Sequence, residues 1–312
     1  MPPAPPESAG VAWRTSDSIE PVGTEWRGLV MKVDSHVHLW DMRHTPQPWM
    51  SDEHAAIARP FGPADIVPLL ERNGIDSVIL VQGACLDSDT DYLLDEAARH
   101  DWIGAITAWV SLEDPGRAAR RLDELERSPK LRAVRHLSHN EPDHWLLREP
   151  VLESIAMLDD RKLILEVPVV FPRHFDDVVS VAERFPGLRI VIDHLGKPPL
   201  GTPRMSLWER DLRHAAEHPN VLAKVSGLNT ALDWPGWSAE SLRPAVEIAL
   251  DVFGPERLMC GSDWPVALLN GDYDRVWQAT VEVMTSAAPR ALSLLLGESA
   301  RRIYRLEPRP GT

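Results

Sequence analysis

The sequence predicts an α/β protein that consists of a single (β/α)₈ TIM barrel. From residue 31 onward, eight short β-rich runs alternate with longer amphipathic segments, each long enough for one crossover helix. No glycine-rich phosphate-binding turn follows the first run, which disfavours a doubly wound open sheet, the structural alternative. The length of 312 residues also fits one large α/β barrel domain.

The β-rich runs are the first elements on which this prediction depends. Several of them are continuously apolar, such as VILV at 78–81 and IVI at 190–192. Such runs are typical of strands that are buried on both faces of a parallel sheet. The eight predicted strands cover residues 29–36, 76–83, 102–110, 131–138, 162–169, 188–196, 220–228 and 257–265.

Helices are predicted between the strands from apolar spacing and from residues that start or stop a helix. The segment 63–74 begins with Pro63 directly after Gly62 and closes at Gly74, which are typical helix boundaries. The segment 114–128 has apolar residues at helical spacing and opposite charges on its outer face. Similar patterns occupy 88–100, 149–161, 174–186, 206–218 and 239–253.

Residues 31–312 are predicted to form one domain, preceded by a flexible or loosely packed extension over residues 1–30. That extension is rich in Pro, Ser and Glu and lacks the basic and apolar regions of a secretory signal. Met31 is the hypothetical natural start. The two cysteines, Cys85 and Cys260, are expected to be buried and unpaired, which fits a cytoplasmic protein.

The charge balance restricts the partners that we expect. The chain has 33 basic and 47 acidic residues and a formal net charge of −14, which disfavours a nucleic-acid partner. No apolar run approaches the roughly 18 residues of a membrane span, so no membrane partner is expected. A homo-oligomer is left open.

Polar residues gather where the apolar runs end, and catalytic groups of a barrel lie at the carboxyl ends of its strands. Burying such groups without partners would cost about 1–3 kcal/mol each, so they must satisfy one another, bind a ligand, or both. In VDSHVHLWD, an extended chain would place Asp34, His36 and His38 on one face. The other strand-end residues are Gln82, Arg135, His136, Glu166, Asp193, His194, Lys224, Ser226, Ser262 and Asp263.

Four of these residues form a candidate metal site and catalytic centre. His36, His38 and His194 with Asp263 would supply three nitrogens and one oxygen, a set that suits one divalent ion, Zn or Mn. An ion there could lower the pKa of water from about 16 to about 7, and Asp263 could act as general base. Two alternatives stay open: hydrogen-bonded core histidines, and histidines that polarise a substrate carbonyl without metal.

The motifs also resemble one family of hydrolases over about residues 31–306. The segments in question are VDSHVHLWD, SVILVQ, LRAVRHLSHNEPDHWLL, RFPGLRIVIDHLGKPP, LAKVSGL and MCGSDWPV. Their order and spacing are similar to those of amidohydrolase 2-type lactonases of the amidohydrolase superfamily, such as L-fuconolactonases, L-rhamnonolactonases and 2-pyrone-4,6-dicarboxylate lactonases. DHLGKP and GSDWP are the most specific of these matches.

The resemblance implies a distorted amidohydrolase-type barrel that opens the ring of a lactone, above all a sugar aldonolactone of carbohydrate metabolism. It implies that His36 and His38 are the strand-one pair, that His194 is the strand-six histidine and that Asp263 activates water. Glu166 stands where relatives usually hold an aspartate, so its role as a metal ligand or as a support of one is open. The lactonase group has metal-dependent and metal-independent members, so metal-independent catalysis is also open.

Other residues are candidates for substrate binding. Arg135 could hold a carboxylate or hydroxyl in bidentate fashion, and Lys224 could stabilise developing negative charge. Alternatively, each pairs with Glu166 or Asp193. Further candidates for substrate contact are Gln82, His139, Trp145 and Trp264; for His139 and Trp145 the alternative is packing within a loop.

Two other functions compete with the lactonase hypothesis. One is a metal-dependent decarboxylase of an unsaturated or aromatic acid, the chemistry of a sister branch of the same superfamily. The other is a sugar-acid binding protein without catalysis. Asp263 argues against the binding protein, because such a protein needs no acid that activates water.

Overall fold

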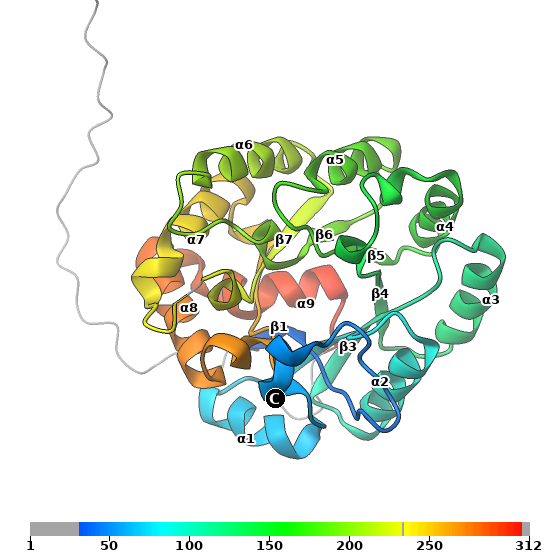
Figure 1. Cartoon of the computed structure of the whole chain (residues 1–312), viewed down its shortest axis with the longest axis horizontal. Helices are drawn as coiled ribbons and strands as arrows, with labels where there is room; N and C mark the ends of the chain where they lie inside the picture. The colour runs from blue at the N-terminus through cyan, green and yellow to red at the C-terminus, as the bar shows by residue number, and fades with distance from the viewer. Residues whose placement is uncertain (1–30, 233, 308–312) are drawn as a thin grey trace, which may run out of the picture. The chain divides into compact units, whose positions relative to one another are not determined.

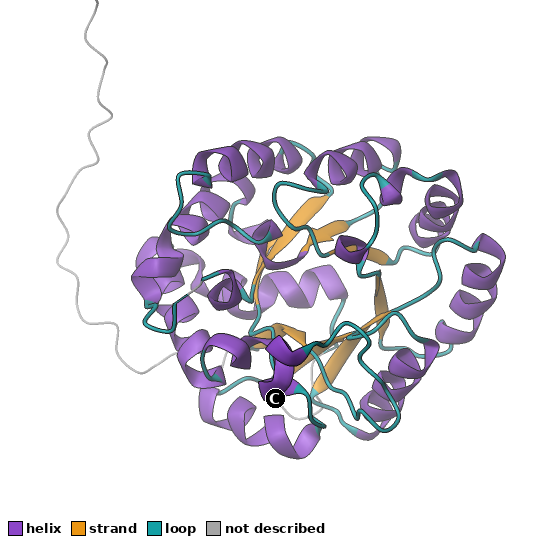
Figure 2. Cartoon of the chain, in the orientation of Figure 1, coloured by secondary structure: helices purple, strands orange, loops and turns teal. Residues whose placement is uncertain are grey.

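The computed structural model describes residues 31–232 and 234–307, and the predicted extension over 1–30 lies outside this part. Eight parallel strands pair in the order β1 to β8, with helices between them on the outside (Figures 1 and 2). This arrangement confirms the predicted (β/α)₈ barrel. The strands are β1 (Val33–Val37), β2 (Ser77–Val81), β3 (Ile103–Ala108), β4 (Leu131–Arg135), β5 (Ile164–Val167), β6 (Ile190–Ile192), β7 (Val221–Val225) and β8 (Leu258–Cys260).

The seven predicted helices are present with boundaries that differ by a few residues. Gly62 caps the first of them and Gly74 ends it in the left-handed conformation, as the sequence indicated. Two helices after β8 were not delimited from the sequence, α8 and α9. The helices are α1 (Pro63–Asn73), α2 (Asp87–Arg99), α3 (Pro115–Leu125), α4 (Glu149–Asp160), α5 (Phe175–Arg184), α6 (Met205–Ala216), α7 (Ala239–Phe253), α8 (Tyr273–Ala287) and α9 (Ser299–Tyr304).

The barrel interior is layered along the strand direction. Helix α9 lies across the centre of the ring in Figure 1, and its Tyr304 packs into an apolar layer to which every strand contributes. This layer contains Val33, Ile79, Ala105, Ala133, Ile164, Val191, Leu222 and Met259. Since side chains alternate along a strand, the next inward positions lie two residues further on. From β3 to β7 these positions are polar, in or directly after the strand: Thr107, Arg135, Glu166, Asp193 and Lys224.

The first and last strands meet just beyond their regular ends. The backbone N–H of Asp263 donates to the carbonyl of His36 at 2.9 Å, and that of His38 donates to the carbonyl of Trp264 at 2.7 Å. A parallel bridge joins Val37 to Trp264. These bonds bring the segment after β8 against the carboxyl end of β1, and they place Asp263 beside the two histidines.

One expectation about β1 is wrong. Asp34 does not share a face with His36 and His38, because a register shift between Asp34 and Val37 interrupts the alternation of side chains. The carboxylate of Asp34 instead accepts from the backbone N–H of Ser262 at 2.8 Å and from the hydroxyl of Tyr273 at 2.9 Å. Asp34 therefore ties β1 to the segment after β8 and to α8.

The cysteines differ from one another. Both are unpaired, and Cys260 in β8 is buried as expected, but Cys85 is only partly buried. Cys85 follows β2 in a loop, where its sulfur accepts from the backbone N–H of Leu137 at 3.4 Å. Among the described residues, no helix is long and apolar enough to span a membrane.

Candidate functional site

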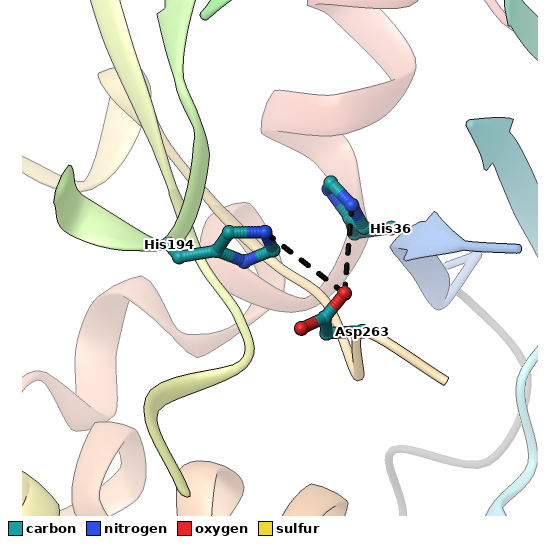
Figure 3. Close-up of side chains that lie close together, drawn as sticks. All are labelled: His36, His194 and Asp263. Carbon is teal, nitrogen blue, oxygen red and sulfur yellow. Dashed lines mark ion pairs between the residues drawn. The ribbon is translucent and has the colours of Figure 1, made fainter. Parts of the chain in front are cut away.

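Three histidines converge on the carboxylate of Asp263 at the carboxyl ends of the strands. The Oδ1 atom of Asp263 lies 3.4 Å from Nε2 of His38, 3.7 Å from Nε2 of His36 and 3.9 Å from Nε2 of His194. Figure 3 shows the contacts of His36, in β1, and of His194, in the short helical turn that follows β6. The structure thus brings together all four residues that were predicted to form the catalytic centre.

Backbone conformation aims two of these side chains inward. Asp263 has φ 63° and His194 has φ 54°, both in the left-handed region that non-glycine residues rarely adopt. Gly227, with φ 58°, lies against both side chains, and a Cβ atom there would overlap Oδ2 of Asp263 and approach Nδ1 of His194 to 2.9 Å. The close approach of the two residues therefore requires glycine at position 227.

Hydrogen bonds fix how the imidazoles present their nitrogens. Nδ1 of His38 lies 2.8 Å from the carbonyl of Val81, which can only accept, so in the neutral ring Nδ1 carries the hydrogen and Nε2 has the lone pair. Nδ1 of His194 lies 2.9 Å from the hydroxyl of Ser226. Both residues consequently direct Nε2 toward Asp263.

Burial sets the protonation state of the cluster. It lowers the pKa of His194 to about 4 and that of His36 well below the ordinary value, in His36 against the opposing charge of Asp193. Burial alone would raise the pKa of Asp263, but His194, His38 and His36 together hold it below its usual range. At neutral pH, His36 and His194 are therefore neutral and the carboxyl of Asp263 is ionised, the forms that bind metal ions.

The cluster fits a divalent metal ion. Within the described residues, neither carboxylate oxygen of Asp263 has a hydrogen-bond donor, although the side chain is buried. Ligands about 2.1 Å from a tetrahedral Zn²⁺ lie about 3.4 Å apart, and Nε2 of His36 is 3.2 Å from Nε2 of His38. Ligand atoms of His36, His194 and Asp263 all lie within 4.8 Å of one another. An ion there would bind one of these free oxygens and leave the other able to accept a proton.

A layer of buried charges lies beneath the histidines. Arg135 donates from Nη1 to Oδ2 of Asp193 at 2.8 Å, and Lys224 donates to Oε2 of Glu166 at 2.6 Å. Nη1 of Arg135 also lies 3.2 Å from Nε2 of His36. The alternative in which both cations pair with these carboxylates is therefore present in the structure. The roles of Arg135 and Lys224 in substrate binding stay predictions.

Glu166 has further partners inside the barrel. The hydroxyls of Thr107 and Tyr304 donate to its Oε1 at 2.5 and 2.6 Å. Its Oε2 faces Lys224, so both carboxylate oxygens are engaged. This arrangement favours a role for Glu166 in holding Lys224.

The remaining predicted contacts lie around this centre. Gln82 is buried and donates to the carbonyl of Arg135 at 3.3 Å, while its Oε1 has no donor among the described residues. Burial lowers the pKa of His139 to about 3. Trp145 is 1% exposed, and its indole N–H donates to Glu113 at 2.6 Å.

Trp264 also lies inside the structure. It is 2% exposed, and its ring meets Phe61 edge-on at 5.2 Å between centroids. Substrate contact by Gln82, His139, Trp145 or Trp264 stays a prediction.

Two contacts in the site were not predicted from the sequence. Asp193 is predicted only as a possible ion-pair partner of Arg135 or Lys224, but its Oδ1 also lies 3.4 Å from Nδ1 of His36 and can hold that ring in place. The position of Asp193 directly before His194 in DHLGKP could have indicated that it belongs to the site. Tyr304 reaches Glu166 from α9, and no motif in the sequence indicates this contact.

The chain is similar to several known proteins over most of its length. A family model described as "Amidohydrolase" matches residues 33–306. L-fucono-1,5-lactonases of Burkholderia ambifaria and Burkholderia multivorans are 36% and 35% identical, over 89% and 90% of this chain and 97% of each relative. The crystal structure of an amidohydrolase from Burkholderia multivorans with bound Zn has a TM-score of 0.83 and 34% identity, and the match covers 89% of this chain and 100% of that chain.

Proposed function

This chain belongs to the amidohydrolase family, and we propose that it hydrolyses the ring ester of a lactone, with a sugar aldonolactone as its substrate. The observation that carries this proposal is the 36% identity to an L-fucono-1,5-lactonase over 285 residues, together with the His–Asp cluster at the strand ends. A decarboxylase has less support, because the two Burkholderia L-fucono-1,5-lactonases share about a third of their residues with this chain.

The proposed reaction begins with the attack of water on the lactone carbonyl. Asp263 takes a proton from this water through a carboxylate oxygen that has no donor among the described residues. The bond between the carbonyl carbon and the ring oxygen then breaks, and the proton passes from Asp263 to that oxygen. The products of this step are a hydroxyl group and a carboxylic acid on one open chain, and the acid releases its proton to the solvent at neutral pH.

We propose that His36, His38, His194 and Asp263 hold one divalent ion, Zn²⁺ or Mn²⁺. When bound, such an ion polarises the ester carbonyl and lowers the pKa of water. The donor set and the free oxygens of Asp263 support this proposal. Arg135 lies beside His36 and is proposed to bind a substrate oxygen.

The replacement Asp263→Asn tests the proposed general base. We expect kcat on L-fucono-1,5-lactone and related aldonolactones to fall at least about 100-fold, since general bases contribute about 10²–10⁴-fold. Acid release on a lactone panel is the measurement. Asp143→Asn, at an exposed carboxylate that pairs with Arg173, is the matched control and should keep the parental rate.

Three results, from this assay or from parallel measurements of CO₂ release and lactone binding, would contradict the proposal. Parental turnover in the Asp263→Asn variant would remove Asp263 from the mechanism. Release of CO₂ from an unsaturated or aromatic acid, without lactone hydrolysis, would identify a decarboxylase. Calorimetric binding of lactones without any hydrolysis would identify a binding protein.

Removal of the metal with a chelator tests the proposed ion. We expect the stripped protein to lose lactone hydrolysis and to regain it with Zn²⁺ or Mn²⁺, because the ion assists carbonyl polarisation. Elemental analysis before and after stripping measures the metal content. A stripped, metal-free protein that hydrolyses at the parental rate would instead assign the polarisation to the histidines themselves.

The cellular location, the partners and the oligomeric state of the enzyme stay predictions. The composition favours a cytoplasmic location and no nucleic-acid partner, and a homo-oligomer is left open.

A further inference from the structure

A second group of metal-type ligands lies below His36, on the barrel side of the proposed ion. Its members are His36 and the carboxylates of Glu166 and Asp193, whose ligand atoms lie within 4.8 Å of one another. All three residues are at most 1% exposed. The two ligand groups share His36, so they are neighbouring positions in one site. A neutral imidazole offers one lone pair, and Nε2 of His36 faces Asp263, so the carboxylates of Glu166 and Asp193 are the ligands left for a second ion.

The ammonium of Lys224 lies among these three groups. Its Nζ is 2.6 Å from Oε2 of Glu166, 3.5 Å from Oδ1 of Asp193 and 3.3 Å from Nδ1 of His36. Lys224 is fully buried, and its ammonium also lies 5.5 Å from the centre of the Tyr304 ring. A positive charge therefore already stands where the second ligand group would place an ion.

We propose that the ammonium of Lys224 is a built-in substitute for a second metal ion, and that removing it opens this position to a second divalent cation. The inference concerns the number of cations that the site holds, so it does not depend on which lactone is the substrate.

Charge balance supports this substitution. Glu166 and Asp193 are two carboxylates inside the barrel, and burying them without cations would cost several kcal/mol per ion. Arg135 bonds Oδ2 of Asp193 at 2.8 Å, which leaves Lys224 as the cation that faces Glu166. Removal of Lys224 would leave one buried negative charge unbalanced.

The contacts of Asp193 point to the same position. Its Oδ1 is fully buried and has no hydrogen bond with good geometry among the described residues; it faces Nδ1 of His36 at 3.4 Å and Nζ of Lys224 at 3.5 Å. Carboxylate oxygens such as those of Asp193 and Glu166 are the ligands that Mn²⁺ and Mg²⁺ prefer. A divalent ion would therefore find suitable ligands once the lysine side chain is shortened.

The number of ions bound by Lys224→Ala tests the proposal. We expect this variant, equilibrated with Mn²⁺ and dialysed, to hold one more ion per chain than the parent by elemental analysis. The electron paramagnetic resonance spectrum of the added Mn²⁺ should show coupling to a neighbouring ion. The measured quantity is the difference in metal content between the variant and the parent. If the parent holds no metal, the metal proposal above fails, but an additional ion in Lys224→Ala can still be detected.

Two further variants isolate the position. Lys197→Ala removes a lysine whose ammonium donates to Thr230 at 3.0 Å instead, and this matched control should gain no ion. The double variant Lys224→Ala/Glu166→Gln keeps the space but loses a carboxylate, and it should return to the parental metal content. Ethylammonium should compete with the second Mn²⁺ in Lys224→Ala, because it replaces the lost ammonium.

The proposal is overturned if folded Lys224→Ala holds no more metal than the parent. If this variant does not fold in metal-free buffer, its folding is measured by circular dichroism with Mn²⁺ or ethylammonium. Recovery with either cation supports the inference. Failure to recover with both shows that the lysine does not serve as a replaceable cation.

Discussion

At the scale of single residues, left-handed backbone conformations allow the side chains of the site to approach one another. Gly227 has φ 58° and lies directly against Asp263 and His194, which themselves have positive φ. A side chain at position 227 would displace the carboxylate that we propose as general base. The geometry of the site therefore depends on a residue that performs no chemistry.

The replacement Gly227→Ala should lower activity more than stability. The left-handed conformation costs alanine about 1 kcal/mol, while a misplacement of about 1 Å at a reacting group can cost about 100-fold in rate. We expect kcat/KM on the lactone substrate to fall at least about 10-fold, measured together with the melting temperature.

Gly74→Ala is the matched control for this prediction. Gly74 has φ 63°, but a Cβ atom there would meet only Nζ of Lys32 at 3.7 Å. This variant should lose stability and keep its turnover. Equal losses of turnover in the two glycine variants would contradict the role of Gly227 in the site.

The residues of the site were predictable to different degrees. His36, His38, His194 and Asp263 could be grouped because each follows an apolar run that ends at the same rim of a barrel. The orientation of Asp34 could not be predicted, because it depends on a register shift that is fixed by partners distant in the sequence.

At the scale of elements, α9 connects the apolar layer of the barrel interior to the layer of buried charges, because Tyr304 packs in the first and bonds Glu166 in the second. This helix covers only Ser299–Tyr304, too short to give a clear amphipathic pattern, and it was not delimited from the sequence. The eight strands and seven of the helices were predictable because long periodic segments carry stronger signals. The contact of Tyr304 with Glu166 is tertiary and has no local signal.

The replacement Tyr304→Phe should destabilise the protein without a change of fold. It removes one of the two hydroxyls that donate to Oε1 of Glu166, and the loss of a buried hydrogen bond to a charged group costs about 1.5–3 kcal/mol. Urea denaturation measures the free energy of unfolding. Tyr92→Phe, at a partly buried tyrosine in α2, is the control; equal effects would contradict the proposed coupling.

At the scale of the whole molecule, buried histidines make stability depend on pH. Burial holds the pKa of His194 at about 4 and that of His139 at about 3, both below the ordinary value of 6.5, and lowers that of His36 as well. The folded protein keeps these rings neutral, whereas the unfolded chain binds protons below pH 6.5. The stability that they contribute is complete above that pH and is lost as pH falls toward 4.

We expect the melting temperature of the metal-free protein to fall between pH 7 and pH 5. Each of these histidines contributes a loss of up to about 2 kcal/mol at pH 5. Asp34 acts in the opposite direction: burial raises its pKa from 3.8 to about 6, so its contribution is present at low pH and lost as pH rises through 6.

The variant His139→Asn checks the origin of this pH dependence. It removes one of the titrating rings outside the Asp263 cluster, so its stability should decline less steeply below pH 6.5 than that of the parent. Differential scanning calorimetry across the range provides both curves. Identical slopes would mean that His139 does not contribute.

The junction of β1 with the segment after β8 has a consequence for biosynthesis. Asp34 and Ser262 are bonded across 228 positions of the chain, and His36 meets Asp263 at the same junction. A nascent chain that lacks the last strand therefore carries the first two histidines without the acid that they face. Hydrolytic capacity would therefore arise only after residue 263 has been synthesised and has reached the first strand.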